Sequence, residues 1–135
     1  MFISKETDYA IRIIRSLSDG KLHSVNDLVE SEMIPKQFAY KITKKLEKGG
    51  YIRIHRGVKG GCELSKEPEN ISVKDIILAI EDRVEVSHCM EPGYACPWKD
   101  SHGICTVHNK LGEIQGQVNQ LLEGYSMADL LSKDV

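Results

Sequence analysis

Residues 35–65 read PKQFAYKITKKLEKGGYIRIHRGVKGGCELS, and this stretch decides the fold class. Pro35 suits the first turn of a helix, and the apolar residues after it recur at helical spacing until the glycine pair at 49–50 ends the helix. Residues 51–55 then alternate like a half-buried strand, a glycine-rich turn follows, and residues 62–65 form the returning strand. The stretch therefore predicts one helix followed by a two-stranded hairpin with a basic tip.

Two more helices are predicted upstream of this stretch. Apolar residues recur at helical spacing from Thr7 to Leu17, before an Asp-Gly pair ends the helix. Ser24, followed three residues later by Asp27, forms a capping box that predicts a second, short helix. Three short helices followed by a hairpin are the plan of a winged helix-turn-helix, whose third helix enters the major groove of DNA.

The sequence predicts one compact unit with two regions. Residues 1–66 form the winged helix-turn-helix region, and residues 67–135 form the second region. A capping box at Ser72 opens a helix, whereas residues 84–104 carry proline, glycine and cysteine without helical periodicity and predict an irregular loop. A long helix follows, because apolar residues then recur at heptad intervals: Val107, Leu111, Ile114, Val118 and Leu121. The predicted fold class is mainly α with a small β-hairpin wing, namely a winged helix-turn-helix plus a long dimerisation helix.

The charged residues are distributed unevenly along the chain. Lys and Arg number 18 against 20 Asp and Glu, but residues 1–61 hold 12 basic and 7 acidic residues, whereas residues 62–135 hold 6 and 13. The basic half suits nucleic acid. No apolar run approaches the roughly 18 residues of a membrane helix, and the start lacks the plan of a signal peptide. We therefore expect a soluble, cytoplasmic protein without a membrane partner, in which four cysteines favour metal binding or free thiols over disulfides.

The predicted third helix has a basic outer face. Its outward positions are expected to be Lys36, Gln37, Tyr40, Lys41, Lys44 and Lys48, and the hairpin adds Arg53, Arg56 and Lys59. A run of lysines alone is more often a solvated face, but two adjacent basic elements could neutralise several phosphates, the largest contribution to DNA affinity. The first three side chains are expected to reach base edges, and Lys41 and Lys44 to bind phosphates. Arg56, at the tip of the hairpin, is expected to enter a minor groove.

Three cysteines lie in the expected cluster-binding loop, residues 88–108. Cys89, Cys96 and Cys105 have the spacing C-x6-C-x8-C, and His108 follows them. Structural zinc sites usually contain tight C-x2-4-C pairs, which this spacing lacks, whereas thiolates are the normal ligands of an iron–sulfur cluster and a loop can wrap it. Three unrelated free cysteines are the plainer alternative. The spacing favours a cluster but leaves zinc and free thiols open.

Taken together, these residues resemble the bacterial Rrf-two family of regulators, which includes the iron–sulfur proteins IscR, NsrR and RirA. The resemblance covers nearly the whole chain. It rests on residues 7–12 (TDYAIR), the wing at 56–61 (RGVKGG), residues 71–77 (ISVKDII) and the three loop cysteines. It implies a homodimeric winged-helix transcription factor, usually a repressor, whose DNA binding depends on whether a [2Fe–2S] or [4Fe–4S] cluster is intact. Pairing of the heptad-spaced helix with its copy would place two recognition helices about one turn apart on a near-palindromic site in double-stranded DNA.

The resemblance also bears on the fourth cluster ligand. In the NsrR type an acid in the first helix reaches the partner subunit's cluster, and Asp8 stands at the matching position. In the IscR type a histidine is the fourth ligand. His108 stands at the matching position, on the same helix face as Cys105. Asp8 is preferred because the Thr-Asp-x-Ala opening looks more like the NsrR type. A [4Fe–4S] cluster is preferred over [2Fe–2S], although the loop spacing departs from the shorter intervals of IscR.

The expected function is therefore a cluster-dependent DNA-binding regulator that senses nitric oxide, redox state or iron. The alternatives are a zinc-binding or cluster-free winged-helix regulator and, less favoured, an electron carrier. The sequence has no nucleophile–base motif and no phosphate-binding glycine loop before a helix, so we expect no enzyme. Cys62 is expected to be a small buried hydrophobe rather than a ligand, and His88 and His102 to be exposed loop residues.

Overall fold

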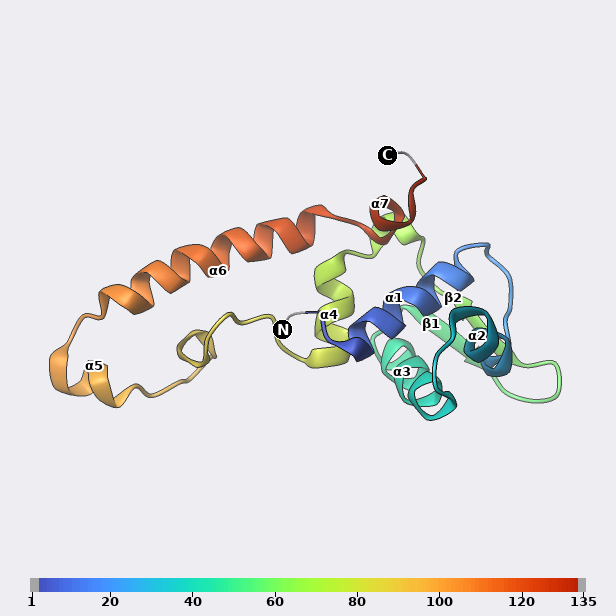
Figure 1. The fold of residues 1–135 in the computed structure, drawn as a ribbon, viewed down its shortest axis with the longest axis horizontal. Helices are drawn as coiled ribbons and strands as arrows, with labels where there is room; N and C mark the ends of the chain where they lie inside the picture. The colour runs from blue at the N-terminus through green and yellow to red at the C-terminus, as the bar shows by residue number, and fades with distance from the viewer. Residues whose placement is uncertain (1–2, 134–135) are drawn as a thin grey trace.

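The computed structural model describes residues 3–133, which fold into helices and one small sheet (Figure 1). The elements are α1 (Lys5–Leu17), α2 (Val25–Glu32), α3 (Lys36–Lys48), β1 (Ile52–His55), β2 (Gly61–Leu64), η1 (Pro68–Asn70), α4 (Val73–Glu81), η2 (His88–Met90), α5 (Pro97–His102), α6 (Thr106–Gly124) and α7 (Met127–Leu131). Helices α1 to α4, the hairpin and α7 gather in one body. Helix α6 and the segment before it extend from this body as an arm, with α5 at its far end. The mainly helical fold with a two-stranded wing is confirmed.

Local capping signals place several of the helix starts. Capping boxes are present at Ser24, Ser72 and Ser126, where each serine accepts the backbone N–H of an aspartate three residues later and that aspartate accepts the serine N–H. Ser4 caps α1 by accepting the N–H of Thr7. Because each cap satisfies backbone donors that a helix leaves unpaired, these starts follow from local sequence.

One hydrophobic core joins the helix-turn-helix to elements from later in the chain. Ile13, Ile42 and Leu46 from α1 and α3 are fully buried, and so are Ile76 of α4 and Met127 of α7. All of these side chains belong to the same cluster. The body therefore depends on packing between the first and second halves of the sequence, and that packing fixes where α3 and the wing stand.

The wing is tied to the helix-turn-helix by a backbone bridge. In the antiparallel hairpin, Cys62 lies opposite Ile54. The Cys62 N–H donates to the His23 carbonyl over 2.7 Å, and the His23 N–H donates to the Cys62 carbonyl over 2.9 Å. A Cβ at Gly61 would stand 2.4 Å from the His23 carbonyl oxygen, so this close approach requires glycine. Cys62 is fully buried, as predicted, and burial raises the pKa of its thiol to about 11.

A buried carboxylate joins α1 to the end of α2. Glu32 is only 8% exposed and accepts hydrogen bonds from the Ser16 hydroxyl over 2.8 Å and from the Arg15 guanidinium, whose Nε lies at 3.2 Å. Burial opposes ionisation of this carboxyl, but the hydrogen bonds from Arg15 and Ser16 outweigh it and hold the pKa of Glu32 below its usual range. This contact fixes the helix that precedes the turn into α3.

The Glu32 contact predicts a pH-dependent stability. A carboxyl whose pKa is lowered by folding contributes stability above its unfolded pKa, roughly 4.3, and that contribution is lost as the pH falls through the folded value. We expect Glu32→Gln to lower the free energy of unfolding by about 1–2 kcal/mol at neutral pH, with the difference from the unaltered protein disappearing at low pH. Urea unfolding across the acid range measures this. Glu30→Gln, an exposed position in the same helix, should change little.

The segment between α4 and α6 is only partly irregular. The prediction of a loop without helix over residues 84–104 is wrong at Pro97–His102, which form α5. Pro97 provides the preset first turn and Gly103, at φ +85°, ends the helix. Six residues are too few to show helical periodicity in the sequence, and this explains the error. None of residues 85–104 is buried, so the segment has no core of its own.

Helix α6 confirms the predicted long helix, and its heptad-spaced set is partly covered, because Leu111 and Val118 are half-buried whereas the other three members are exposed. Val107, Ile114 and Leu121 are 66%, 49% and 61% exposed. Leu122, four residues after Val118, packs against the small cluster around Ile77 of α4. Across the part of the chain that the structure describes, no helix combines the length and apolar character needed to cross a membrane.

Candidate nucleic-acid interface and cysteine segment

The outer face of α3 lies beside the wing. Every side chain predicted to face DNA is exposed: Lys36, Gln37, Tyr40, Lys41, Lys44, Arg53, Arg56 and Lys59. Tyr40, Lys44 and Arg56 line the same shallow cleft between α3 and the hairpin. A neighbouring hollow adds the start of α2, at Ser24 to Asn26. The fold therefore brings Tyr40 and Lys44 of α3 beside Arg56 of the wing.

Two of these cations already have acidic partners. The Lys41 ammonium donates to Glu6 Oε1 of α1 over 2.8 Å. Arg53 stands opposite Glu63 in the hairpin, with Nη1 4.0 Å from Oε1. The contact between Glu6 and Lys41 joins positions 35 residues apart, so no local sequence signal could have revealed it.

The three predicted cysteine ligands each stand at the start of a helical element or inside one. Cys89 lies in η2, Cys96 precedes α5, and Cys105 precedes α6. All three are half-buried. The Cys89 sulfur lies 3.2 Å from the Ser87 hydroxyl, and the Cys105 sulfur accepts the backbone N–H of His108 over 3.3 Å. Within residues 3–133 of a single protomer, no three His, Cys, Asp or Glu side chains come together as a metal site.

The donor chemistry nevertheless fits a cluster. His108 sits in the first turn of α6, and its Nδ1 is buried without a hydrogen-bond partner among the described residues. A buried nitrogen left without a partner is costly, so a ligand or a partner chain at this place would relieve it. With three thiols on one segment that has no core, the residues suit a group that would hold the segment together.

Asp8, the preferred fourth ligand, lies far from the cysteines of its own chain. It stands on α1 in the body, whereas α5 lies at the far end of the arm (Figure 1). Its carboxylate pairs with Arg12 over 2.9 Å and is 45% exposed. Arg12 also donates to the Glu32 carbonyl at the end of α2 over 3.1 Å. A role for Asp8 as a ligand therefore needs a cluster from a second protomer.

The remaining histidines of the cysteine segment are exposed, as predicted. His88 is paired with Glu91, with Nδ1 2.9 Å from Oε1. His102 belongs to α5 rather than to a loop, and its ring stacks on Trp98 with centroids 4.4 Å apart. Both contacts are local, and neither histidine lies in a group of metal-binding side chains among the described residues.

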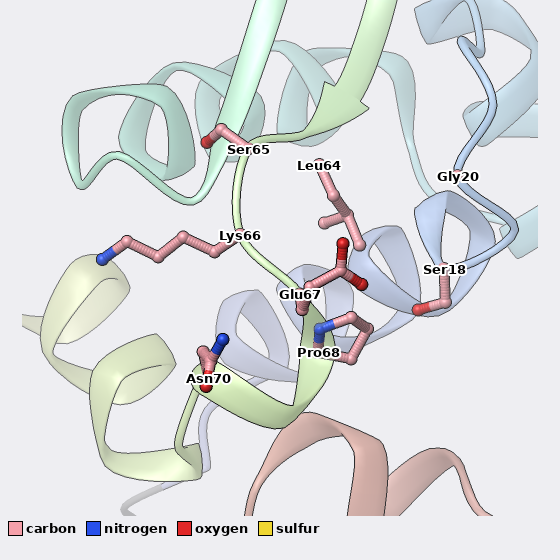
Figure 2. Close-up of a pocket in the computed structure, with 8 residues that line it drawn as sticks. All are labelled: Ser18, Gly20, Leu64, Ser65, Lys66, Glu67, Pro68 and Asn70. Carbon is pink, nitrogen blue, oxygen red and sulfur yellow. The ribbon is translucent and has the colours of Figure 1, made fainter.

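A separate pocket lies between the end of α1, the end of β2 and η1. Figure 2 shows its lining residues: Ser18, Gly20, Leu64, Ser65, Lys66, Glu67, Pro68 and Asn70. The lining contains no cysteine or histidine. This pocket therefore has no part in the candidate metal chemistry.

Comparison with known proteins gives the family. The family model Rrf2, described as an iron-dependent transcriptional regulator, matches residues 3–133. The chain belongs to the Rrf2 family. It is similar to the HTH-type transcriptional regulator NsrR of Shouchella clausii, with 30% identity over 135 residues that cover 97% of this chain and 89% of that protein. This Rrf2 chain is thus a transcriptional regulator of a DNA-binding family and not an enzyme.

Solved structures of Rrf2 regulators share the fold. The structure of CymR from B. subtilis, titled the global cysteine regulator, has a TM-score of 0.71 at 19% identity and covers 98% of each chain. The structure of IscR from T. potens has a TM-score of 0.70 at 19% identity and covers 95% of this chain and 84% of that one. These likenesses confirm the winged-helix architecture.

Proposed function

We propose that this Rrf2 regulator is a homodimer that controls transcription through an iron–sulfur cluster held by Cys89, Cys96 and Cys105. The cluster would be [4Fe–4S], with [2Fe–2S] as the alternative. When bound, it would supply a centre that reacts with nitric oxide or oxygen or is lost when iron is scarce. The protein would then be a repressor that binds a near-palindromic operator.

The observation that carries the proposal is the cysteine segment itself. Its residues 85–104 contain no buried side chain, so apolar packing does not hold it, and coordination of three thiolates would order it. Loss of the cluster would release that order, which is a common type of regulatory switch. The segment joins the body through α4 and α6, so its order can affect how two protomers are spaced.

The DNA-binding side of the proposal rests on the α3–wing surface. Lys36, Gln37 and Tyr40 at the start of α3 would reach base edges. Lys44 would bind a phosphate, and Lys41 would bind one when it leaves Glu6. Arg53, Arg56 and Lys59 would hold the adjacent backbone or minor groove. Two such surfaces, related by the twofold axis of a dimer, would bind half-sites about one turn of DNA apart.

Anaerobic purification tests the proposal as a whole. A coloured protein with visible absorbance, bound iron and acid-labile sulfide is expected. Its affinity for a duplex selected from a random library should differ at least tenfold between cluster-loaded and cluster-free protein. A cluster-free Rrf2 regulator is the second candidate, because three thiols stand apart in one protomer. This second candidate predicts a colourless protein whose affinity for DNA is the same after anaerobic and aerobic purification. A colourless protein with stoichiometric zinc would also contradict the cluster.

The fourth ligand is tested by two separate substitutions. We expect Asp8→Ala to shift the visible spectrum and to speed loss of the cluster in air, because the cluster would then lack one of its proposed protein ligands. His108→Ala should leave the spectrum unchanged. Arg12→Gln is the matched control, since it removes the ion-pair partner of Asp8 and keeps the carboxylate. A spectral change in His108→Ala alone would assign the ligand to the histidine.

A further inference from the structure

A single acidic side chain of α1 contacts two lysines of α3. Glu6 Oε1 accepts a hydrogen bond from Lys41 over 2.8 Å, and Glu6 Oε2 lies 3.7 Å from the Lys45 ammonium. Lys45 also donates to the carbonyl of Ile80 at the end of α4 over 2.8 Å. Lys45 is thereby fixed between three helices, whereas the ammonium of Lys41 is held by Glu6.

The two lysines differ in what they could offer to DNA. The Lys41 side chain is 52% exposed and lies at the edge of the basic face, on the side of α3 nearest α1. The Lys45 side chain is less exposed and its ammonium is used within the body. Only Lys41 could exchange the Glu6 carboxylate for a DNA phosphate without breaking a contact to the α4 backbone.

The ion pair is not needed to hold α1 against α3. Tyr9 and Phe38 already pack between these helices with ring centroids 5.8 Å apart, and Ile13, Ile42 and Leu46 share the core. An exposed ion pair adds little to stability. The hydrogen bond from Lys41 outweighs partial burial and holds the pKa of the Glu6 carboxyl below its usual range, so the side chain is charged at neutral pH.

We propose that Glu6 is a positioning residue that competes with DNA phosphate for Lys41 and so limits the affinity of α3 for DNA. The inference rests on the proposed DNA-binding function. A carboxylate beside the recognition helix both occupies one cation and repels phosphate oxygens. Lys41 is thus a potential phosphate contact that Glu6 occupies. Any movement of the first turn of α1 away from α3 would free the Lys41 ammonium.

The salt dependence of DNA binding tests this role. Each phosphate neutralised steepens the plot of log affinity against log salt concentration by about 0.9. Glu6→Gln should steepen the slope by about 1.8 for a dimer, about 0.9 from each protomer, and raise affinity at low salt, because Lys41 of each protomer becomes free to bind a phosphate. Lys41→Gln should remove this gain in the Glu6→Gln background and change the slope little in the unaltered chain. All variants are compared as the same anaerobic preparation with the same selected duplex.

Glu69→Gln is the charge-matched control, since Glu69 is exposed in η1. An equal slope change in Glu6→Gln and Glu69→Gln would reduce the effect to net charge and overturn the proposal. A Lys41→Gln effect of the same size in both backgrounds would overturn it as well, because Lys41 would then already bind DNA beside Glu6. If the unaltered chain shows no salt-dependent affinity for any duplex, the DNA-binding function itself fails, which is a different result.

Discussion

Replacing Cys96 by alanine is expected to abolish the visible absorbance of the anaerobically purified protein and its bound iron and sulfide. Cys96 is the most informative of the three cysteines, because its side chain makes no capping hydrogen bond to α5. The Cys105 sulfur, by contrast, accepts the His108 N–H at the start of α6. Removing the Cys96 thiol should therefore change cluster binding with little direct effect on the helices.

The fold of the Cys96→Ala protein should remain that of the cluster-free chain. Substitutions of unburied side chains usually change the free energy of unfolding by less than about 0.5 kcal/mol, so thermal unfolding followed by circular dichroism should match that of the cluster-free unaltered protein. Cys62→Ala is the matched control, because Cys62 is fully buried in the core. It should retain the absorbance while losing some stability. Full absorbance in Cys96→Ala would remove this cysteine from the ligand set.

Replacing Ile114 by glutamate is expected to convert the proposed dimer into a monomer. Ile114 lies in the centre of the heptad-spaced side of α6 and is 49% exposed in one protomer, outside both core clusters. In a paired helix, twofold symmetry would bring each new carboxylate near its copy in an apolar seam, and a buried unpaired charge is strongly unfavourable. Sedimentation velocity at micromolar concentration should show the loss of the dimer.

Monomerisation should also weaken DNA binding sharply. A dimer binds its second half-site at high effective concentration, so loss of the linkage lowers operator affinity by roughly 100-fold or more. Gln120→Glu adds the same charge at an exposed position of α6 outside the heptad-spaced set and should leave both the dimer and the affinity intact. A dimeric Ile114→Glu protein, or a monomeric unaltered chain with full operator affinity, would contradict pairing through α6.

Local sequence was enough for most of the secondary structure. The serine-aspartate capping boxes predicted helix starts correctly because both partners stand three residues apart, and the strands of the wing followed from alternation and glycine. The heptad spacing from Val107 predicted α6, because intervals of three and four residues place apolar side chains on one side of a helix. Helix α5 was missed, because a six-residue helix shows no periodicity.

The candidate site divides in the same way. The basic face of α3 could be predicted, because exposure follows from which side of an amphipathic helix is apolar. The sequence also showed that three cysteines and His108 belong to one segment. It could not show whether their side chains meet, since an unpacked segment takes its form from its ligand or partner. Their chemistry is a property of the sequence, and their arrangement is not.

The amino-acid sequence by itself determined the strands, the helices other than α5, their order, the basic face and the set of sulfur donors, because each depends on neighbours within a few positions. Only the tertiary structure paired Glu6 with Lys41, Arg15 with Glu32, and the His23 backbone with Cys62. These contacts join residues 35, 17 and 39 positions apart and form only when the shared core brings the helices together. The charge that α3 can offer to DNA is therefore set by packing, although its lysines are visible in the sequence.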